Sequence, residues 1–444
     1  MELQGKNIAV IGLAKTGLAT AEFLLRRGAK VTATDMNPQS LAAAALPGMK
    51  TAAHDPEILT GVDLVVPSPG VPPANPILAA AAEAGIPILS ELELAGRFLR
   101  TPLIAITGTN GKTTTTALIG HILGQSGRRV FVGGNIGAPL IGYAGGPQED
   151  HWAVIEVSSF QLQWSVTFHP AVAVLLNVTA DHLDYHGSFT AYRAAKERLF
   201  ANQTAADTAI LNGDDPGTAA LAPRLAARTL RFRSGGPATT GMYPEGEELV
   251  YVSPAGERES YPRSMVKLPG THNLENVMAA VMAARSCGCS PAEIAAAVAS
   301  FAGFPHRIEY AGQWRGVSFY DDSKGTNVDA VRRALETFTA PVILLMGGRD
   351  KAGDFRPLIP LVRQKAKRLV LFGEARESIG AVLGGLVATD YHPTLREGIA
   401  AAAAAAGGGD TVLMSPGCAS FDEFRDYKAR GKFFQDQVKA LAHD

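Results

Sequence analysis

Short apolar runs that alternate with helix-length segments recur along the whole 444-residue chain and indicate an α/β fold. The N-terminal part shows this pattern first. An apolar run at 7–11 leads through a glycine turn into an amphipathic segment that ends near Arg27, and a second run follows at 30–34. This order is typical of a βαβ unit with parallel strands. With two shorter predicted strands at 63–66 and 86–89, it predicts a Rossmann-like domain over residues 1–95.

The middle of the chain repeats the alternation and predicts a central domain over residues 96–303 with a mostly parallel sheet. Between its strands and two predicted closing helices at 274–285 and 291–301, the region 245–267 has shorter alternating runs with Gly and Pro. That region predicts an antiparallel insertion. The predicted parallel strands are 102–106, 152–157, 171–176 and 209–211.

The last section, residues 304–444, again alternates strands with helices and predicts a second Rossmann-like domain with a parallel, doubly wound sheet. Three domains also agree with the length of the chain, at roughly 150 residues for each domain. The predicted strands of this section are 317–320, 342–346, 368–372 and 411–414.

Composition excludes several classes of protein. The chain has 41 Lys and Arg against 42 Asp and Glu, and this formal net charge of −1 argues against a surface for nucleic acid. No apolar run of the sequence approaches the roughly 18 residues of a membrane span, and residues 2–6 do not open a signal peptide. Three cysteines cannot form a disulfide framework. We therefore expect a cytoplasmic monomer that binds no nucleic acid and does not enter a membrane.

The sharpest motif is the glycine-rich segment 106–113, which joins a predicted strand to a predicted helix. Such a turn directs backbone N–H groups at an anion on the positive end of the helix. Lys112 would reach the terminal phosphates of a nucleotide, and the Thr113 hydroxyl would face Mg²⁺. The full P-loop pattern has glycine where Ile106 stands, so this is a shorter form. The alternative is a plain turn with a solvated lysine.

A second glycine turn, at 12–17, is a weaker signal. A dinucleotide fingerprint requires a middle glycine, where this chain has Ala14. Asp35 lies about twenty residues further on, where an acidic residue would meet a ribose. The pattern favours a domain that binds a nucleotide without redox chemistry, and a structural turn is the alternative.

Polar residues follow two central strands. Glu156 ends an apolar run, where a carboxylate is costly unless it is paired or bound to a metal. Asn177, Asp181 and His182 follow the next run, at the sheet edge where α/β folds place their sites. Taken alone, His182 is better explained as an ordinary loop residue. Lys196 has the spacing of a solvated residue on an amphipathic helix.

Three further polar clusters, at 321–327, 347–351 and 415–427, each follow a predicted strand of the last section. Because parallel strands end at one edge of a sheet, these clusters predict a ligand crevice, with helix capping as the alternative. His306 and Arg307 stand at the start of this section. They could touch a phosphate or simply lie on the surface.

In combination, these motifs resemble the Mur ligase family of ATP-dependent amino-acid ligases of peptidoglycan synthesis. The resemblance spans nearly the whole chain in the family's order. It rests on Thr-Gly-Thr-Asn-Gly-Lys-Thr at 107–113, Glu-x-Ser-Ser-Phe-Gln-Leu at 156–162, Asn-x-Thr-x-Asp-His at 177–182, Tyr-Arg-Ala-Ala-Lys at 192–196, His-Asn-x-x-Asn at 272–276, Pro-His-Arg at 305–307 and Asp-Ser-Lys-x-Thr-Asn at 322–327.

The resemblance implies a role for each motif. Lys112 would hold the γ-phosphate of ATP and, with Glu156, His182 and Lys196, act in catalysis. Two Mg²⁺ ions are implied, the first held by Thr113 and Glu156 and the second by His182 and Lys196. Lys196 would carry a carbamate derived from CO₂. The implied ATP-binding residues are Gly108, Thr109, Asn110, Gly111, Lys112, Thr113, Thr114, Asn273, Arg307 and Asp322.

Within the family, the glycine turn at 12–17, the loop 133–137 and the segment 415–427 resemble the members that add D-glutamate to UDP-N-acetylmuramoyl-L-alanine. The implied residues for the UDP substrate are Leu13, Lys15, Thr16, Asp35, Ser68, Gly70 and Asn135, and those for D-glutamate are Thr326, Lys351, Ser420 and Tyr427. Tyr427 stands where the family pattern has Phe.

Three alternatives stay open. A sibling ligase of the family would add a different amino acid. A P-loop ATPase switch would explain the segment 106–113 and Glu156 but not the other clusters. A nicotinamide oxidoreductase is disfavoured by Ala14.

Overall fold

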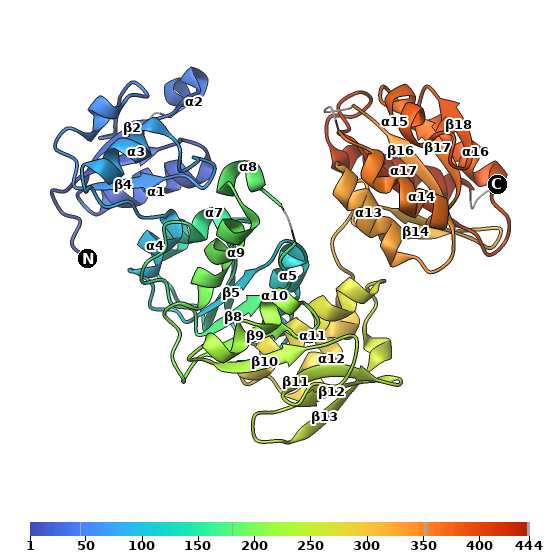
Figure 1. The fold of residues 1–444 in the computed structure, drawn as a ribbon, viewed down its shortest axis with the longest axis horizontal. Coiled ribbons are helices and arrows are strands. Elements are labelled where there is room, and N and C mark those ends of the chain that lie inside the picture. The colour runs from blue at the N-terminus through green and yellow to red at the C-terminus, as the bar shows by residue number, and fades with distance from the viewer. Residues whose placement is uncertain (45, 180, 350–352, 442–444) are drawn as a thin grey trace. The chain divides into compact units, whose positions relative to one another are not determined.

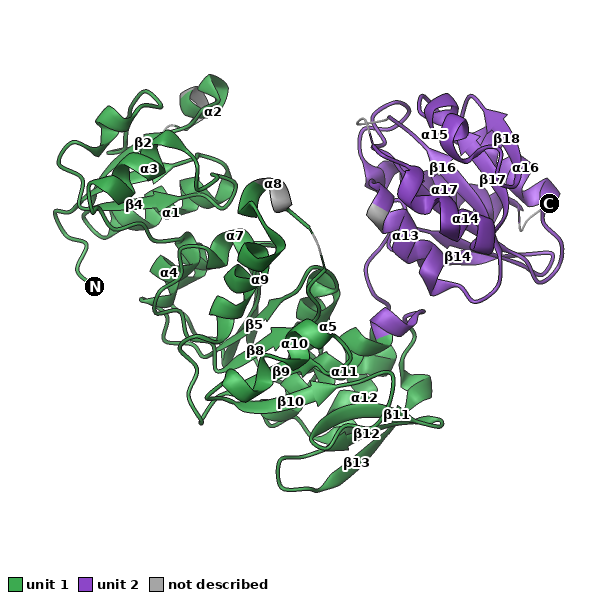
Figure 2. Ribbon diagram, in the orientation of Figure 1, with its two compact units in different colours: residues 1–267, 274–301 green, residues 268–273, 302–444 purple. Residues whose placement is uncertain are grey.

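The computed structural model describes residues 1–444 except 45, 180, 350–352 and 442–444, and the described residues form three β-sheets (Figure 1). The chain divides into two compact units (Figure 2). Unit 1 comprises residues 1–267 and 274–301, and unit 2 comprises residues 268–273 and 302–444. One sheet lies within each of the three predicted domain ranges. This arrangement agrees with the predicted three-domain α/β class, whereas the domain bounds stay a prediction.

The first sheet is parallel and has the order β3-β2-β1-β4. Its strands are β1 (Asn7–Ile11), β2 (Lys30–Thr34), β3 (Lys50–Thr51) and β4 (Leu64–Pro67). Helix α1 (Lys15–Arg26) packs on one face and α3 (Pro76–Glu83) on the other, and the section also contains α2 (Pro38–Ala43) and α4 (Glu91–Gly96).

The strand predicted at 86–89 is wrong. Among the described residues this segment makes only an isolated bridge, between Ile88 and Val65. Pro87 has no N–H to donate to a ladder. Its carbonyl still accepts the Val65 N–H at 2.9 Å, and Leu89 donates to the Val65 carbonyl at 3.0 Å.

The central sheet has the order β13-β12-β11-β10-β9-β8-β5-β7-β6. Strand β5 lies between β8 and β7, and all of its residues are buried. The strands are β5 (Leu103–Thr107), β6 (Val130–Gly134), β7 (Trp152–Glu156), β8 (Val172–Leu175), β9 (Thr208–Asn212), β10 (Arg228–Phe232), β11 (Gly241–Glu245), β12 (Glu248–Val252) and β13 (Arg258–Pro262). The antiparallel pairs β11–β12 and β12–β13 confirm the predicted insertion.

Helices cover both faces of the central sheet (Figure 1). On one face, α5 (Lys112–Gln125), α11 (Thr271–Ser286) and α12 (Pro291–Ser300) pack on Ile104 and Ile106. Burying such an aliphatic side chain stabilises the fold by about 1.5–3 kcal/mol. The remaining helices of this section are α6 (Leu140–Ala144), α7 (Ser159–Leu162), α8 (Leu183–His186), α9 (Phe189–Glu197) and α10 (Pro216–Ala219).

The sheet of unit 2 has the order β14-β15-β19-β16-β17-β18. Its strands are β14 (Glu309–Trp314), β15 (Val317–Asp321), β16 (Val342–Gly347), β17 (Ala366–Phe372), β18 (Ala388–His392) and β19 (Thr411–Gly417). The prediction of a wholly parallel sheet is wrong, because β14 pairs antiparallel with β15. Helices α13 (Val328–Thr337), α14 (Ile359–Lys365) and α15 (Arg376–Leu383) pack on one face, and α16 (Leu395–Ala405) and α17 (Tyr427–Leu441) on the other.

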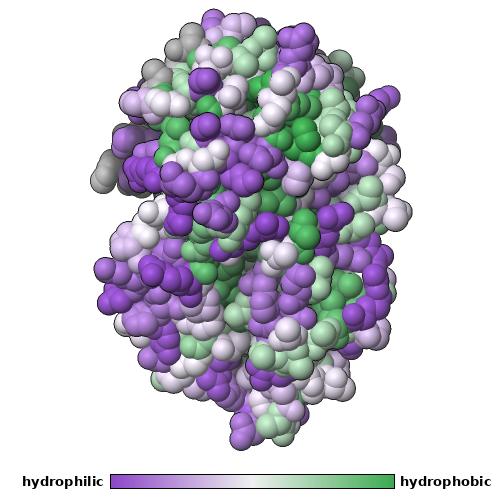
Figure 3. All heavy atoms as spheres, turned by 90° about the vertical axis from the view of Figure 1, so that its left-hand side faces the viewer, coloured by the Kyte–Doolittle hydropathy of each residue, from purple (hydrophilic) through white to green (hydrophobic). Residues whose placement is uncertain are grey.

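The surface is of mixed character. On the face drawn in Figure 3, hydrophilic and apolar side chains are interspersed, as is usual for a folded protein. None of the helices in the described part of the chain has the length and apolar character that crossing a membrane requires.

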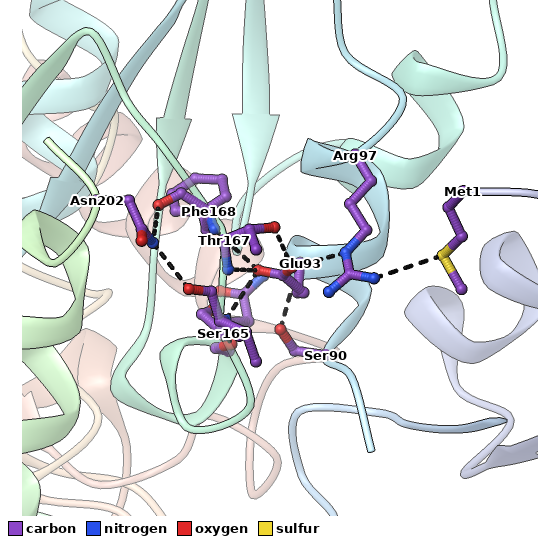
Figure 4. Close-up of polar contacts among 10 residues, drawn as sticks. Met1, Ser90, Glu93, Arg97, Ser165, Thr167, Phe168 and Asn202 are labelled. Atoms are coloured by element: carbon purple, nitrogen blue, oxygen red, sulfur yellow. Dashed lines mark hydrogen bonds and ion pairs between the residues drawn. The ribbon is translucent and has the colours of Figure 1, made fainter. Parts of the chain in front are cut away.

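A buried carboxylate joins the first two sections of unit 1. Glu93, on α4, accepts the backbone N–H groups of residues 166–168 at 2.9 Å each, and it also accepts the Thr167 hydroxyl and the Arg97 guanidinium (Figure 4). Its side chain is 0% exposed. Burial alone would raise the pKa of Glu93, but the hydrogen bonds from Thr167, Val166 and Arg97 outweigh it and hold the pKa below its usual value.

We expect Glu93→Gln to destabilise unit 1 by about 3 kcal/mol, because an amide cannot accept all of these donors and its own N–H₂ would face one of them. Since the pKa is lower in the folded state, the stabilisation is present above the unfolded pKa and is lost as pH falls through the folded pKa. Urea denaturation between pH 3 and 7, followed by tryptophan fluorescence, measures both effects. The exposed Glu83→Gln serves as the control, and equal stability of the two variants at pH 7 would contradict the prediction.

Candidate active site

The glycine-rich segment forms a tight turn between β5 and α5. Gly111 precedes the helix with φ of +82°, and a Cβ atom there would lie 2.2 Å from the Asn276 side-chain oxygen. Gly108 has φ of +155°, at the edge of the region that favours glycine. The N-terminal N–H groups of α5 and the helix dipole therefore face this turn, which is the geometry that binds anions.

The turn is held from behind by residues that follow β8. Asn177 accepts the Thr109 N–H on its carbonyl and the Asn110 N–H on its side-chain oxygen, each at 2.9 Å. The Thr109 hydroxyl donates to the Thr179 carbonyl at 3.1 Å and shares a 3.0 Å hydrogen bond with the Tyr192 hydroxyl. Asn177 stands in a motif of the sequence without an assigned role, and the structure identifies it as a support of the loop.

The Nζ atoms of two lysines converge on one backbone carbonyl. Lys112 Nζ donates to the carbonyls of Gly108 and Thr109, and Lys196 Nζ donates to the same Gly108 carbonyl, all at 2.9 Å. Lys196 is 2% exposed, so the solvated position that its helical spacing predicts is wrong.

The surroundings of Lys196 favour its neutral amine. Burial lowers the pKa of Lys196 well below its usual value and the charge of Lys112 lowers it further, while Asp181 and Glu156 act in the opposite direction. Asp181, which the sequence places at this sheet edge without a defined role, is one of the two carboxylates that act on the charge of Lys196. The Asn-x-Thr-x-Asp-His motif at 177–182 contains it and could have indicated it.

Glu156, at the end of β7, has the properties of a metal ligand. It is 3% exposed, and one carboxylate oxygen accepts the Asn135 side-chain amide at 2.8 Å. The other, Oε2, is buried and has no hydrogen-bond partner within the described residues. Such an oxygen is costly unless a cation meets it, and Mg²⁺ prefers oxygen ligands. Thr113, the residue predicted to share the ion with Glu156, is the second residue of α5.

His182 lies in the loop before α8, in the left-handed region with φ of +51°. Its side chain is 48% exposed, and its ring packs edge-on to Phe160 with centroids 4.8 Å apart. The ring nitrogen lies 3.5 Å from Asp181 Oδ2. Exposed imidazole and carboxylate groups at this edge could together bind a divalent cation.

The predicted residues for the UDP substrate meet around the first glycine turn. The Asp35 carboxylate accepts the Leu13 N–H at 2.7 Å, and the Ser68 hydroxyl donates to the Gly12 carbonyl at 2.8 Å. The turn is compact, because a Cβ atom at Gly17 would lie 1.8 Å from the Gly12 oxygen. Two further predicted residues lie beside this turn in the sequence. Thr16 is on the first turn of α1, and Gly70 follows β4.

Hydrogen bonds connect both the first glycine turn and Glu156 to the loop after β6. Lys15 Nζ donates to the Gly137 carbonyl at 2.5 Å, across from the first section into the loop after β6. Asn135, in the same loop, contacts Glu156 through its side-chain amide. Two sites that are far apart in sequence are therefore neighbours in unit 1.

In unit 2, Asp322 lies in the loop after β15, is 5% exposed and accepts the Ser415 hydroxyl at 2.7 Å. Burial raises its pKa to about 7, against the opposing effects of Ser415 and Arg307. Arg307 is exposed, and Asn273 donates through its side-chain amide to the Pro269 carbonyl at 2.7 Å.

The three predicted strand exits of unit 2 also meet. The last residue of β19, Gly417, donates its N–H to the Gly325 carbonyl in the loop after β15 at 2.9 Å. The loop after β19 is joined to the exit of β16 by a paired contact between Ala419 and Arg349. Ser420 is 2% exposed, Thr326 is half-buried, and Tyr427 begins α17. Lys351 lies outside the described residues. Arg430, which contacts two of these loops, was not identified from the sequence.

Comparison with known proteins matches each section separately. Residues 6–90 match the family model "Mur ligase MurD-like, N-terminal domain", residues 106–284 match "Mur ligase middle domain", and residues 306–418 match "Mur ligase, glutamate ligase domain". Among solved structures, the chain resembles UDP-N-acetylmuramate-alanine ligase MurC from Thermotoga maritima, with a TM-score of 0.58 and 20% identity over 98% of this chain and 99% of that one. That likeness supports the fold alone.

Curated relatives are similar over their full length. A UDP-N-acetylmuramoylalanine--D-glutamate ligase from Syntrophus aciditrophicus is 54% identical over 100% of this chain and 99% of the relative. A protein of the same name from Geobacter metallireducens is 44% identical over 99% of both chains. The order of the matched sections and the identity over the whole length establish that the chain belongs to the Mur ligase family.

Proposed function

We propose that this chain joins D-glutamate to UDP-N-acetylmuramoyl-L-alanine at the expense of ATP, as a ligase of peptidoglycan and cell-wall synthesis. The observation that carries the proposal is the site in unit 1, where Lys112 and Lys196 contact the phosphate loop and Glu156 lies on the neighbouring strand end. Lys15, beside the first glycine turn, contacts the loop after β6, whose Asn135 contacts Glu156. The names of its full-length relatives support the choice of substrates.

The reaction has two steps. A carboxylate oxygen of the alanyl group attacks the γ-phosphorus of ATP, the bond to the ADP oxygen breaks, and an acyl phosphate forms. The amine of D-glutamate then attacks the acyl carbon, loses a proton, and phosphate leaves. Both partners of the first step are anions, so positioning and charge neutralisation supply most of the catalysis. Lys112 and the N–H groups of residues 108–114 hold the phosphates.

We further propose two Mg²⁺ sites. Thr113 and Glu156 would hold the first ion, and His182 and the modified Lys196 the second, with Asp181 beside them. Bound Mg²⁺ supplies positive charge to the transferring phosphoryl group. The unpartnered Glu156 oxygen and the exposed His182 ring are the observations that support these ligand sets.

A carbamate on Lys196 resolves the repulsion between the two lysines. The neutral amine attacks CO₂, an N–C bond forms and a proton is released, so the cation is replaced by an anion. That anion would face Lys112 as an opposite charge, and its oxygens would be suitable Mg²⁺ ligands. Burial and the charge of Lys112 lower the pKa of Lys196 well below its usual value, which favours the neutral amine that the step requires.

The remaining roles follow the same proposal. The domains would be 1–95 for the UDP substrate, 96–303 for ATP and 304–444 for the amino acid, in a cytoplasmic monomer. Asn273, Arg307 and Asp322 would contact the nucleotide. The residues proposed for the UDP substrate are Leu13, Lys15, Thr16, Asp35, Ser68, Gly70 and Asn135. Those proposed for D-glutamate are Thr326, Lys351, Ser420 and Tyr427.

Phosphate release from ATP tests the function directly. With UDP-N-acetylmuramoyl-L-alanine present, D-glutamate should support release at least about tenfold faster than L-glutamate, D-aspartate, L-lysine or diaminopimelate, since a polar subsite rejects analogues that leave its groups unpaired. For each amino acid, the same reaction without the UDP substrate is the control. Preference for another amino acid would favour a sibling ligase, and release that needs no amino acid would favour an ATPase switch.

A further inference from the structure

Arg430 is a fully buried arginine on the first turn of α17, at the exits of two strands of unit 2. It is 0% exposed and donates to three backbone carbonyls. Its Nη2 atom donates to Ser323 at 2.9 Å and to Cys418 at 3.1 Å, and Nη1 donates to Ala419 at 3.3 Å. Ser323 follows β15, whereas Cys418 and Ala419 follow β19. One guanidinium therefore joins two of the loops that carry the proposed amino-acid site.

Two glycines allow this approach. A Cβ atom at Gly348, after β16, would lie 2.9 Å from Arg430 Nη1 and 2.2 Å from the Ala419 oxygen. A Cβ atom at Gly431 would lie 2.1 Å from His306 Nδ1. Because both positions are glycine and have no Cβ atom, α17 packs closely against the sheet edge. The Arg430 guanidinium therefore reaches the point where three strand exits meet.

Packing alone does not explain a cation here. Within the described residues Arg430 forms no ion pair, and its Nε atom has no hydrogen-bond partner. Burial lowers its pKa to about 10, with opposing effects from Asp422, Cys418 and the aspartates after β15. A buried charge that contacts only carbonyls is costly, and an apolar side chain of similar volume is often no less stable. The guanidinium therefore contributes something that an apolar residue would not.

Its contribution follows from the geometry of the peptide bond. In a trans peptide the carbonyl and the next N–H point in opposite directions. The Ala419 carbonyl accepts the Arg349 N–H at 2.8 Å and Arg430 Nη1 at 3.3 Å. The N–H of Ser420 therefore points away from both donors, and the Ser420 residue itself is 2% exposed. An anionic group held by this N–H would lie on the far side of the peptide, with the peptide dipole aligned by the guanidinium behind it.

We propose that Arg430 is a positioning residue for the incoming amino acid. It fixes the loop 415–420 against the loop 322–327, so that the Ser420 N–H and hydroxyl meet a carboxylate of the substrate. The inference rests on the proposed function, since the carboxylate in question belongs to D-glutamate. Arg430 does not touch the substrate itself.

Steady-state kinetics of Arg430→Met and Arg430→Lys test this role. Arg430→Met should raise the KM for D-glutamate about 10- to 100-fold, because a displacement near 1 Å has effects of that size. The KM values for ATP and the UDP substrate should change less than about twofold. Lysine keeps the charge and some of the carbonyl contacts. The KM of Arg430→Lys for D-glutamate should therefore lie between those of Arg430→Met and the parent chain. The matched control is Lys432→Met on the same helix, where the side chain is 76% exposed.

Acyl-phosphate formation without amino acid, trapped by borohydride reduction, should be unchanged in both variants. This measurement separates the inference from the proposed function, because failure of the parent chain to form the acyl phosphate or to use D-glutamate would overturn the function itself. An unchanged KM for D-glutamate in a folded Arg430→Met would overturn the positioning role. So would a parallel change of all three KM values, or the loss of folding in both variants, since Arg430 would then serve the fold alone.

Discussion

Replacing Lys196 by alanine is expected to lower the rate of ligation by about three orders of magnitude, the effect of losing a group that neutralises or positions transition-state charge. Lys196 is buried beside the phosphate loop, and it shares the Gly108 carbonyl with Lys112. As a carbamate it would hold a metal ion opposite Lys112. Alanine removes that anion and leaves Asp181 and His182 without their partner. Phosphate release with both substrates measures the loss.

If Lys196 carries a carbamate, three further results are expected at this residue. Short carboxylates such as acetate should partly restore activity to Lys196→Ala, and Lys196→Glu should retain more activity than alanine, because each returns an anion to the site. Removal of CO₂ from the buffer should slow the parent chain reversibly. The exposed Lys267→Ala is the matched control and should behave as the parent. Full activity of Lys196→Ala would exclude the carbamate role.

The strands that could be predicted from the sequence are those buried on both faces of their sheet. The apolar run at 102–106 became β5 within one residue of each predicted end, and those at 171–176 and 342–346 became β8 and β16 with similar accuracy. Strands β14 and β18 were missed. They are the edge strands of their sheet, and charged residues such as Glu309 and Asp390 interrupt the apolar pattern. Edge strands need no continuous apolar run because one side faces solvent.

The candidate site divides in the same way. The phosphate loop could be predicted because its strand, glycines, lysine and helix are adjacent in the chain. The burial of Lys196 could not, since the carbonyl it contacts is 88 residues away and helical spacing indicates only a polar face. The same holds for Arg430, whose partner Ser323 is 107 residues away. Only a family resemblance selected Lys196, and nothing in the motifs selected Arg430.

Lys112→Met should be the second severe variant, with ligation about three orders of magnitude slower. The methionine fills the space between the loop and α5 but cannot neutralise the terminal phosphate of ATP. The variant should also stop at the first step, so no acyl phosphate should be trapped even with saturating ATP. Lys267→Met is the matched control. Trapped acyl phosphate at the parent rate would show that Lys112 does not act on the phosphoryl group.

The same substitution has a second consequence, because Lys112 acts on Lys196 in both of its states. Its charge lowers the pKa of the Lys196 amine, which favours the neutral form that reacts with CO₂. The same charge would stabilise the proposed carbamate as an opposite ion. Both effects favour the carbamate. Lys112→Met should therefore contain less carbamate than the parent at pH 7 and should regain it only at higher pH. The ¹³C NMR signal of protein equilibrated with ¹³CO₂ measures the fraction directly, without any activity, and an equal signal in both proteins would mean that the two lysines are not coupled.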